Sequence, residues 1–125
     1  MGQNMRVVSA KYIFDGVNLL SDKAVLIDGN TIIDVVDKNK VYDVSQIEDF
    51  GDSVISAGLI DLQLNGCGGV LFNDSITLET LETMHQTNLR YGTTSYLPTL
   101  ITSAVADVMQ ALEVTKQWFK LYGNT

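Results

Sequence analysis

The sequence from residue 57 to residue 70 reads Ala57-Gly58-Leu59-Ile60-Asp61-Leu62-Gln63-Leu64-Asn65-Gly66-Cys67-Gly68-Gly69-Val70. In an extended strand successive side chains point to opposite faces, so Asp61, Gln63 and Asn65 share one face. The isoleucine and leucines between them share the other, which suits packing beneath helices. Because each unpaired buried polar group costs roughly 1 to 3 kcal/mol, this polar face predicts a cavity that holds water or ligand. A satisfied structural network at the strand end is the alternative.

The glycine cluster from Gly66 to Gly69 can bring backbone N–H groups close to a ligand, as phosphate-binding loops do. Its spacing does not match a P-loop and no lysine follows it, so a tight turn is the favoured interpretation.

Cys67 has no histidine partner in the sequence pattern, which favours a small packed residue over a nucleophile. The single histidine, His85, lies within a helix pattern and cannot form a zinc site alone. Asp61 and Asp74 qualify for acid or base chemistry by residue type only.

The N-terminal part of the chain has a β pattern from Arg6 to Val36. Two runs rich in branched apolar residues flank Asp28-Gly29-Asn30, which predicts a hairpin with a tight turn. Residues 37–49 are polar and show little periodicity. We expect the first domain to end near Asp52.

After Gly58 the pattern is strand, glycine-rich loop, helix, strand and helix. The first helix is expected over about Leu78 to Tyr91, with Thr77 as its N-cap. The second helix is expected over about Ala104 to Tyr122, with Ser103 as its N-cap. One face of the second helix carries Val105, Val108, Leu112 and Phe119, and both Trp118 and Phe119 are expected in the core. This alternation predicts a parallel α/β sheet, here a truncated barrel or an open domain whose two strands have unpaired edges.

Composition limits the classes of partner. The chain has 125 residues, 46% of them hydrophobic, and a formal net charge of -7. That charge repels nucleic acid and anionic membrane surfaces, although a local pocket can still bind a small anion. One cysteine excludes an internal disulfide and favours a reducing compartment. The first six residues show no export or lipidation signal, and no apolar run approaches the ~20 residues needed to cross a bilayer.

Two stretches resemble a known family. Residues 58–74 resemble the first barrel strand and loop of N-acetylglucosamine-6-phosphate deacetylases, and residues 96–102 resemble their second strand. The β-rich start also resembles their small N-terminal sandwich, so the resemblance covers nearly the whole chain. It implies an α/β protein with a small N-terminal β-sandwich portion over residues 1–52. The first two β/α units of an amidohydrolase (β/α)8 barrel, truncated, would follow over residues 53–125.

The resemblance also implies a site. Asp61, Gln63, Asn65, Gly66 and Cys67 would line the pocket, whereas no catalytic residue and no metal ligand would come from this chain. Many amidohydrolases have His-x-His where Gln63 and Asn65 stand, and an amide is a poorer zinc ligand than imidazole. The divalent metal of the full-length enzyme, expected to be zinc, would be held by a glutamate and two histidines from later strands, and a later aspartate would transfer the proton. Ala57 stands where the family usually has proline.

The resemblance therefore implies the N-terminal part of a cytoplasmic, homo-oligomeric enzyme. Its substrate would be N-acetylglucosamine 6-phosphate, and its products glucosamine 6-phosphate and acetate. We expect the 125-residue chain alone to be inactive. The competing hypothesis is a binding or assembly module that pairs its open sheet with another chain. A different amidohydrolase, such as a base deaminase or cyclic amidase, is disfavoured by Gln63 and Asn65.

Overall fold

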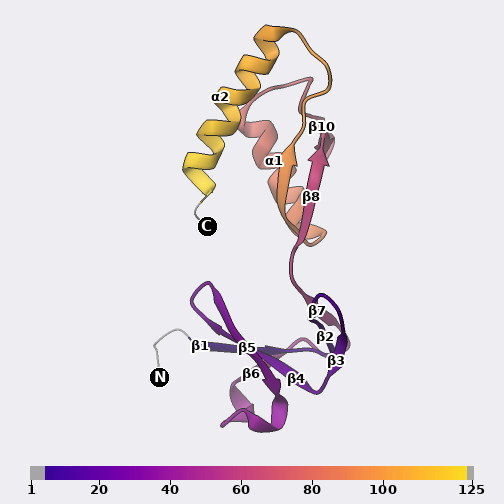
Figure 1. Cartoon of the computed structure of the whole chain (residues 1–125), viewed down its shortest axis with the longest axis vertical. Coiled ribbons are helices and arrows are strands. Elements are labelled where there is room, and N and C mark those ends of the chain that lie inside the picture. Colours follow the sequence, from indigo (N-terminus) through magenta and orange to yellow (C-terminus); the bar gives the residue numbers. More distant parts are fainter. Residues whose placement is uncertain (1–4, 124–125) are drawn as a thin grey trace. The chain divides into compact units, whose positions relative to one another are not determined.

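The computed structural model describes residues 5–123 and divides the chain into two compact units, Met1–Ala57 and Gly58–Thr125 (Figure 1). Residues 1–4, which include most of the segment considered above for export and lipidation signals, lie outside the described residues, as do residues 124–125. The division falls after Ala57 rather than near Asp52. The reason is that β7 (Val54–Ser56) pairs in parallel with β2 (Tyr12–Phe14) and so belongs to the first unit.

The first unit contains two small sheets. One has the strand order β5-β4-β1-β6 and the other β3-β2-β7. The remaining strands of these sheets are β1 (Met5–Ser9), β3 (Leu19–Ser21), β4 (Lys23–Asp28), β5 (Thr31–Asp37) and β6 (Ile47–Asp49). The two sheets share one core, because buried Val8 and Val25 come from the first sheet and buried Ile13 from the second.

The predicted hairpin is confirmed. Strands β4 and β5 are antiparallel, and Asp28 pairs with Thr31 across a two-residue turn. Gly29 has a φ of 56°, a conformation that glycine adopts without steric cost. The segment that follows, residues 37–49, is more regular than its sequence suggested. It contains two short 3-10 turns, Lys38–Lys40 and Val44–Gln46, before β6 pairs in parallel with β1.

The second unit follows the predicted alternation of strands and helices. Its elements are β8 (Leu59–Leu64), β9 (Gly66–Cys67), β10 (Val70–Leu71), α1 (Leu78–Arg90), β11 (Thr93–Pro98) and α2 (Val105–Tyr122). Strands β8 and β11 are parallel, as expected for two strands joined through a helix. Figure 1 shows them side by side with both helices beside the pair.

The two helix starts differ from each other. Thr77 caps α1 as predicted, since its hydroxyl accepts a hydrogen bond from the N–H of Thr80. The prediction for α2 is wrong, because its N-cap is Ala104, which has no side-chain cap bond. The Ser103 hydroxyl instead donates to the carbonyl of Ile101, within the loop that precedes the helix.

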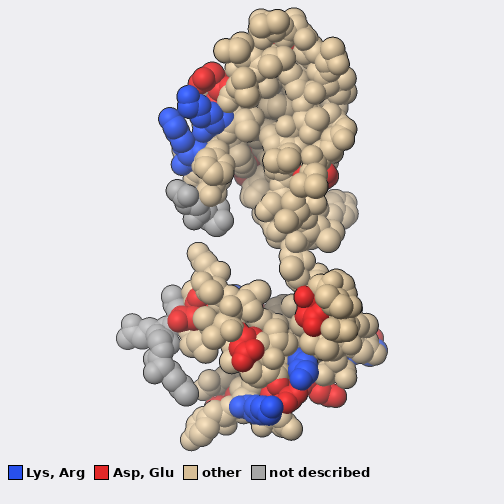
Figure 2. Space-filling model, viewed as in Figure 1, with Lys and Arg blue, Asp and Glu red and all other residues tan. Residues whose placement is uncertain are grey.

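The core of the second unit lies between the helices and the strands. Its buried members are Leu64, Phe72, Ile76, Leu81, Met84 and Ala111. Trp118 packs against this core as predicted, but Phe119 is 66% exposed and the prediction for it is wrong. The whole predicted apolar face of α2 is at least partly solvent-facing, because the helix packs through the neighbouring face that carries Ala111. Figure 2 shows a broad uncharged surface on the visible side of this unit.

Candidate functional site

The burial of Leu64 shows which face of β8 is directed toward the core and which face carries the polar side chains. This leucine is 8% exposed and belongs to the core. Strand alternation therefore places Asp61 and Gln63 on the face directed away from that core. Ile60 and Leu62 were expected beneath helices, yet they are 68% and 71% exposed. The described helices thus cover only the C-terminal end of this strand.

The three polar residues of the motif have different surroundings. Asp61 is half-buried, and its Oδ1 accepts a hydrogen bond from the backbone N–H of Gln63 at 2.9 Å. The Gln63 side chain is exposed. Half-buried Asn65 donates from Nδ2 to the carbonyl of Thr99 at 2.9 Å, and the Thr99 N–H donates to the carbonyl of Leu64 at 2.8 Å. Asn65 therefore joins the C-terminal end of β8 to the C-terminal end of β11.

A second asparagine, which the sequence reasoning missed, makes a similar connection. Asn73 donates from Nδ2 to the carbonyl of Ile101 at 3.1 Å and to Oγ of Ser103 at 2.8 Å. Its Oδ1 accepts from the N–H of Ile101 at 2.8 Å. The residue lies inside the stretch of family resemblance, which was the available signal, but its partners are about thirty positions away and have no local sequence signature.

The glycine cluster forms a hairpin. Strands β9 and β10 are antiparallel, and the turn between them consists of Gly68 and Gly69 with φ values of 67° and 83°. At Gly66 a Cβ atom would lie 2.2 Å from the carbonyl oxygen of Val70, and at Gly68 it would lie 2.2 Å from Oγ1 of Thr87 on α1. Turn geometry and close packing thus explain these glycines, as the tight-turn interpretation predicted.

Cys67 packs toward α1. Its thiol donates to the carbonyl of Met84 at 3.4 Å and lies 3.8 Å from Oδ1 of Asn88. Burial, and to a lesser extent the charge of Asp61, raises the pKa of the Cys67 thiol. A protonated thiol is a poor nucleophile, which agrees with the interpretation of Cys67 as a packed residue.

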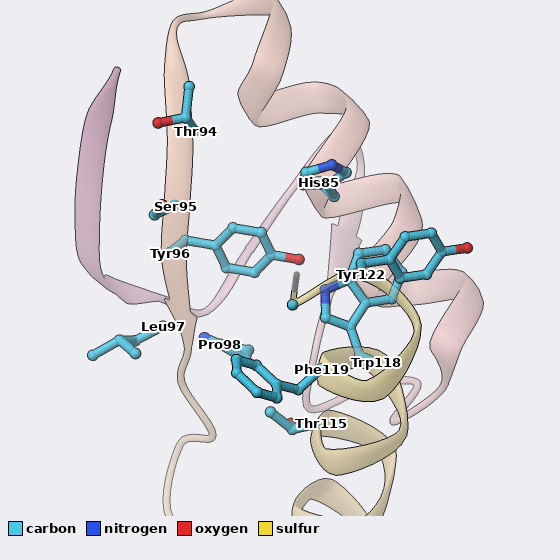
Figure 3. Close-up of a pocket in the computed structure, with 11 residues that line it drawn as sticks. His85, Thr94, Ser95, Tyr96, Leu97, Pro98, Thr115, Trp118, Phe119 and Tyr122 are labelled. Carbon is cyan, nitrogen blue, oxygen red and sulfur yellow. The ribbon is translucent and has the colours of Figure 1, made fainter. Parts of the chain in front are cut away.

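His85 belongs to an aromatic cluster. Its ring centroid lies 5.6 Å from that of Trp118 in an edge arrangement and 6.5 Å from that of Tyr96. Figure 3 shows these side chains around a cavity of about 350 Å³ between α1, β11 and α2. Tyr96 donates from its hydroxyl to the carbonyl of Leu81 at 2.9 Å, and burial raises the pKa of Tyr96 to about 12. The cluster is a packing arrangement, in line with the structural interpretation of His85.

The groups brought together at the carboxyl ends of β8 and β11 are therefore amides, backbone groups and the Ser103 hydroxyl. Among residues 5–123 no group of three or more His, Cys, Asp or Glu side chains is placed to hold a metal ion. Asp74 is exposed. Over the same residues, no helix has the length and apolar character needed to cross a membrane.

Comparison with known proteins identifies relatives of this chain. No protein-family model matches the sequence. The N-acetylglucosamine-6-phosphate deacetylase of Haemophilus influenzae is 39% identical over 112 residues, which are 90% of this chain and 29% of that protein. The chain is homologous to the N-terminal region of N-acetylglucosamine-6-phosphate deacetylases. It spans about a third of the length of these relatives.

Two further comparisons extend this homology. The crystal structure of the Pasteurella multocida N-acetylglucosamine-6-phosphate deacetylase matches 97% of this chain and 32% of its own, with a TM-score of 0.89 and 40% identity. The N-acetylgalactosamine-6-phosphate deacetylase of a Shewanella strain is 54% identical over 55 residues, which are 44% of this chain and 14% of that protein. A Xanthomonas campestris adenosine deaminase with bound zinc matches in fold alone, with a TM-score of 0.51 and 18% identity.

These matches confirm a mixed α/β fold, mostly of strands, that corresponds to the N-terminal region of the deacetylases. They give no role to individual residues. The assignment of Asp61, Gln63, Asn65, Gly66 and Cys67 to a pocket wall stays a prediction, and the packing of Cys67 against α1 does not favour its part in it.

Proposed function

We propose that this chain supplies the N-terminal part of an enzyme that hydrolyses N-acetylglucosamine 6-phosphate to glucosamine 6-phosphate and acetate. The single observation that carries the proposal is the homology, 39% to 40% identical over nearly the whole chain. The parallel β8 and β11 would then be the first two strands of a (β/α)8 barrel, with residues 1–57 forming part of a small β-sandwich.

In such a barrel the active site lies at the carboxyl ends of the strands. This is the end where Asn65 contacts Thr99 and where Asn73 contacts Ile101. The polar face with Asp61 and Gln63 would form part of the pocket wall, because it is directed away from the helices. The exposed apolar residues of this unit, among them Leu62 and Leu112, support the presence of further covering elements.

The donors of this chain do not fit a zinc site by themselves. Gln63 and Asn65 offer amides, which are poorer zinc ligands than imidazole. The residues described between Met5 and Gly123 also lack a cluster of three metal-binding side chains. We therefore propose that the metal suggested by the zinc-containing amidohydrolase neighbour is held by residues outside the third of the enzyme to which this chain corresponds. We also propose that the chain alone is inactive.

The identity of the sugar is the sharper question. One relative is a deacetylase of N-acetylglucosamine 6-phosphate, and another, 54% identical over a shorter stretch, is a deacetylase of N-acetylgalactosamine 6-phosphate. The two substrates differ in the configuration at one hydroxyl. The longer match favours the glucosamine substrate, and the galactosamine substrate is the second candidate.

A fused enzyme tests both points. It consists of this 125-residue chain followed by the part of the H. influenzae deacetylase that the chain does not match, purified with added Zn²⁺. We expect acetate release from both sugar phosphates to be measurable and kcat/KM to be higher for N-acetylglucosamine 6-phosphate. No acetate from either compound, with a folded fused enzyme and an active parent enzyme as control, refutes the proposed function. A higher kcat/KM for N-acetylgalactosamine 6-phosphate would make that compound the proposed substrate instead.

Cytoplasmic location and homo-oligomeric assembly are parts of the same proposal. The single cysteine supports a reducing compartment, since it excludes an internal disulfide.

A further inference from the structure

Asn73 connects two loops that are distant in sequence. It follows β10, in the segment between β8 and α1, and all three of its hydrogen bonds go to the loop between β11 and α2. We call residues 99–104 the β11–α2 loop. Asn73 is half-buried, so these bonds are partly shielded from water.

The Asn73 side chain contacts Ile101 as a neighbouring strand would. Its Oδ1 accepts from the N–H of Ile101, and its Nδ2 donates to the carbonyl of the same residue. Among side chains of this size only an amide offers both a donor and an acceptor in one plane. The Ser103 hydroxyl strengthens the arrangement, because it accepts from Asn73 and donates to the same Ile101 carbonyl.

A second connection fixes the start of the loop. Thr99 accepts from Asn65 and donates to the backbone of Leu64, so the loop is held to the end of β8 at Thr99 and again at Ile101. Gln63 belongs to the polar face of β8, and Asn65 directly follows the strand. The position of the β11–α2 loop relative to this face is therefore set by the two asparagines.

We propose that Asn73 is a positioning residue for the substrate site, which it acts on by holding the β11–α2 loop beside Asn65. This inference rests on the proposed function, because that function places the site at the carboxyl ends of β8 and β11. Asn73 itself is not assigned any contact with substrate.

The first test measures the loop in the 125-residue chain by NMR hydrogen exchange. In Asn73→Leu, which keeps the side-chain volume but removes every hydrogen bond, the Ile101 amide should exchange about three- to tenfold faster, the factor expected for one net hydrogen bond. Asn73→Asp retains an acceptor and should preserve more of the protection. The exposed Ser75→Ala is the matched control and should change nothing. Unchanged Ile101 exchange in Asn73→Leu refutes the proposal.

The second test separates positioning from simple stabilisation. In the fused enzyme, Asn73→Leu should raise KM about three- to tenfold and leave kcat within about twofold, because a displaced pocket wall weakens substrate and transition state alike. Asn73→Asp should recover part of the loss, and Ser75→Ala should behave as the unmodified enzyme. An active fused enzyme whose KM is unchanged by Asn73→Leu overturns this role alone. An unmodified fused enzyme without activity refutes the proposed function and this role together.

Discussion

The hairpin formed by β9 and β10 should be sensitive to a single methyl group at Gly68. Both turn glycines have positive φ, a conformation that costs an alanine about 1–2 kcal/mol. At Gly69 the added Cβ would meet nothing within 4 Å, so Gly69→Ala should cost only this conformational term. Gly69→Ala is therefore the matched control.

Gly68→Ala carries an additional cost. Its Cβ would lie 2.2 Å from Oγ1 of Thr87, which must move and lose its 2.7 Å hydrogen bond to the carbonyl of Thr83. Since a net hydrogen bond contributes about 0.5–1.5 kcal/mol in addition to the conformational cost of about 1–2 kcal/mol, Gly68→Ala should destabilise the second unit by roughly 1.5–3.5 kcal/mol in total. In a Thr87→Ala background, which lacks the obstructing atom and this hydrogen bond from the start, Gly68→Ala should cost only about as much as Gly69→Ala does.

Urea unfolding monitored by tryptophan fluorescence measures these differences. Trp118 is the single tryptophan and lies in the second unit, so its signal reports that unit. The double-mutant cycle of Gly68→Ala and Thr87→Ala isolates the contact between hairpin and helix. If Gly68→Ala and Gly69→Ala have equal free energies of unfolding, or if Gly68→Ala costs as much in the Thr87→Ala background as without it, the hairpin does not pack against α1 as described.

Three further predictions concern single polar groups. Hydrogen bonds from Lys23 and Lys40 lower the pKa of Asp37 to about 2. The stability that Asp37 contributes is therefore present above its unfolded pKa near 3.8 and is lost between about pH 4 and pH 2. Asp37→Asn should flatten that part of the pH profile in acid unfolding. Asn88 is 8% exposed, and its Nδ2 has no hydrogen-bond partner among the described residues. Asn88→Leu should therefore leave the free energy of unfolding unchanged or raise it by about 1 kcal/mol. A loss above about 2 kcal/mol would show that the Asn88 amide is satisfied. Tyr96→Phe removes a hydrogen bond to α1 and should lower the urea midpoint by an amount equivalent to about 1 kcal/mol, whereas an unchanged midpoint excludes a stabilising role.

Local patterns predicted much of the fold. The hairpin at Gly29 and the Thr77 cap follow from residues close in sequence, the parallel pair β8 and β11 follows from the alternation of strand and helix patterns, and all three are confirmed. Such features depend on side-chain alternation, turn conformation and capping bonds, which act over a few residues.

Features set by distant partners were not predicted. Strand β6 lies in a polar segment without periodicity, and its pairing with β1 decides its structure. Ser103 has the right chemistry for an N-cap but hydrogen-bonds within its loop, where Asn73 also contacts it. Phe119 is apolar at helical spacing, yet α2 packs through a different face, and periodicity alone cannot distinguish two adjacent apolar faces.

The candidate site shows the same division. Alternation along β8 predicted the burial of Leu64, but it was wrong for Ile60 and Leu62, which are 68% and 71% exposed because the described helices cover only the end of the strand. The contacts of Asn65 with Thr99 and of Asn73 with Ile101 join positions 34 and 28 residues apart. A single sequence carries no local signal for such pairs, because they exist only once the two strands are paired.

Mixing the two parts of the proposed enzyme tests whether this chain and the remainder of a deacetylase together form one active site. The purified 125-residue chain is combined with the separately purified remainder of the H. influenzae deacetylase and Zn²⁺, and acetate release from N-acetylglucosamine 6-phosphate is followed. We expect acetate from the mixture and none from either part alone. Acetate from the 125-residue chain alone, or from the remainder alone at the rate of the mixture, would show that this chain does not complete the active site.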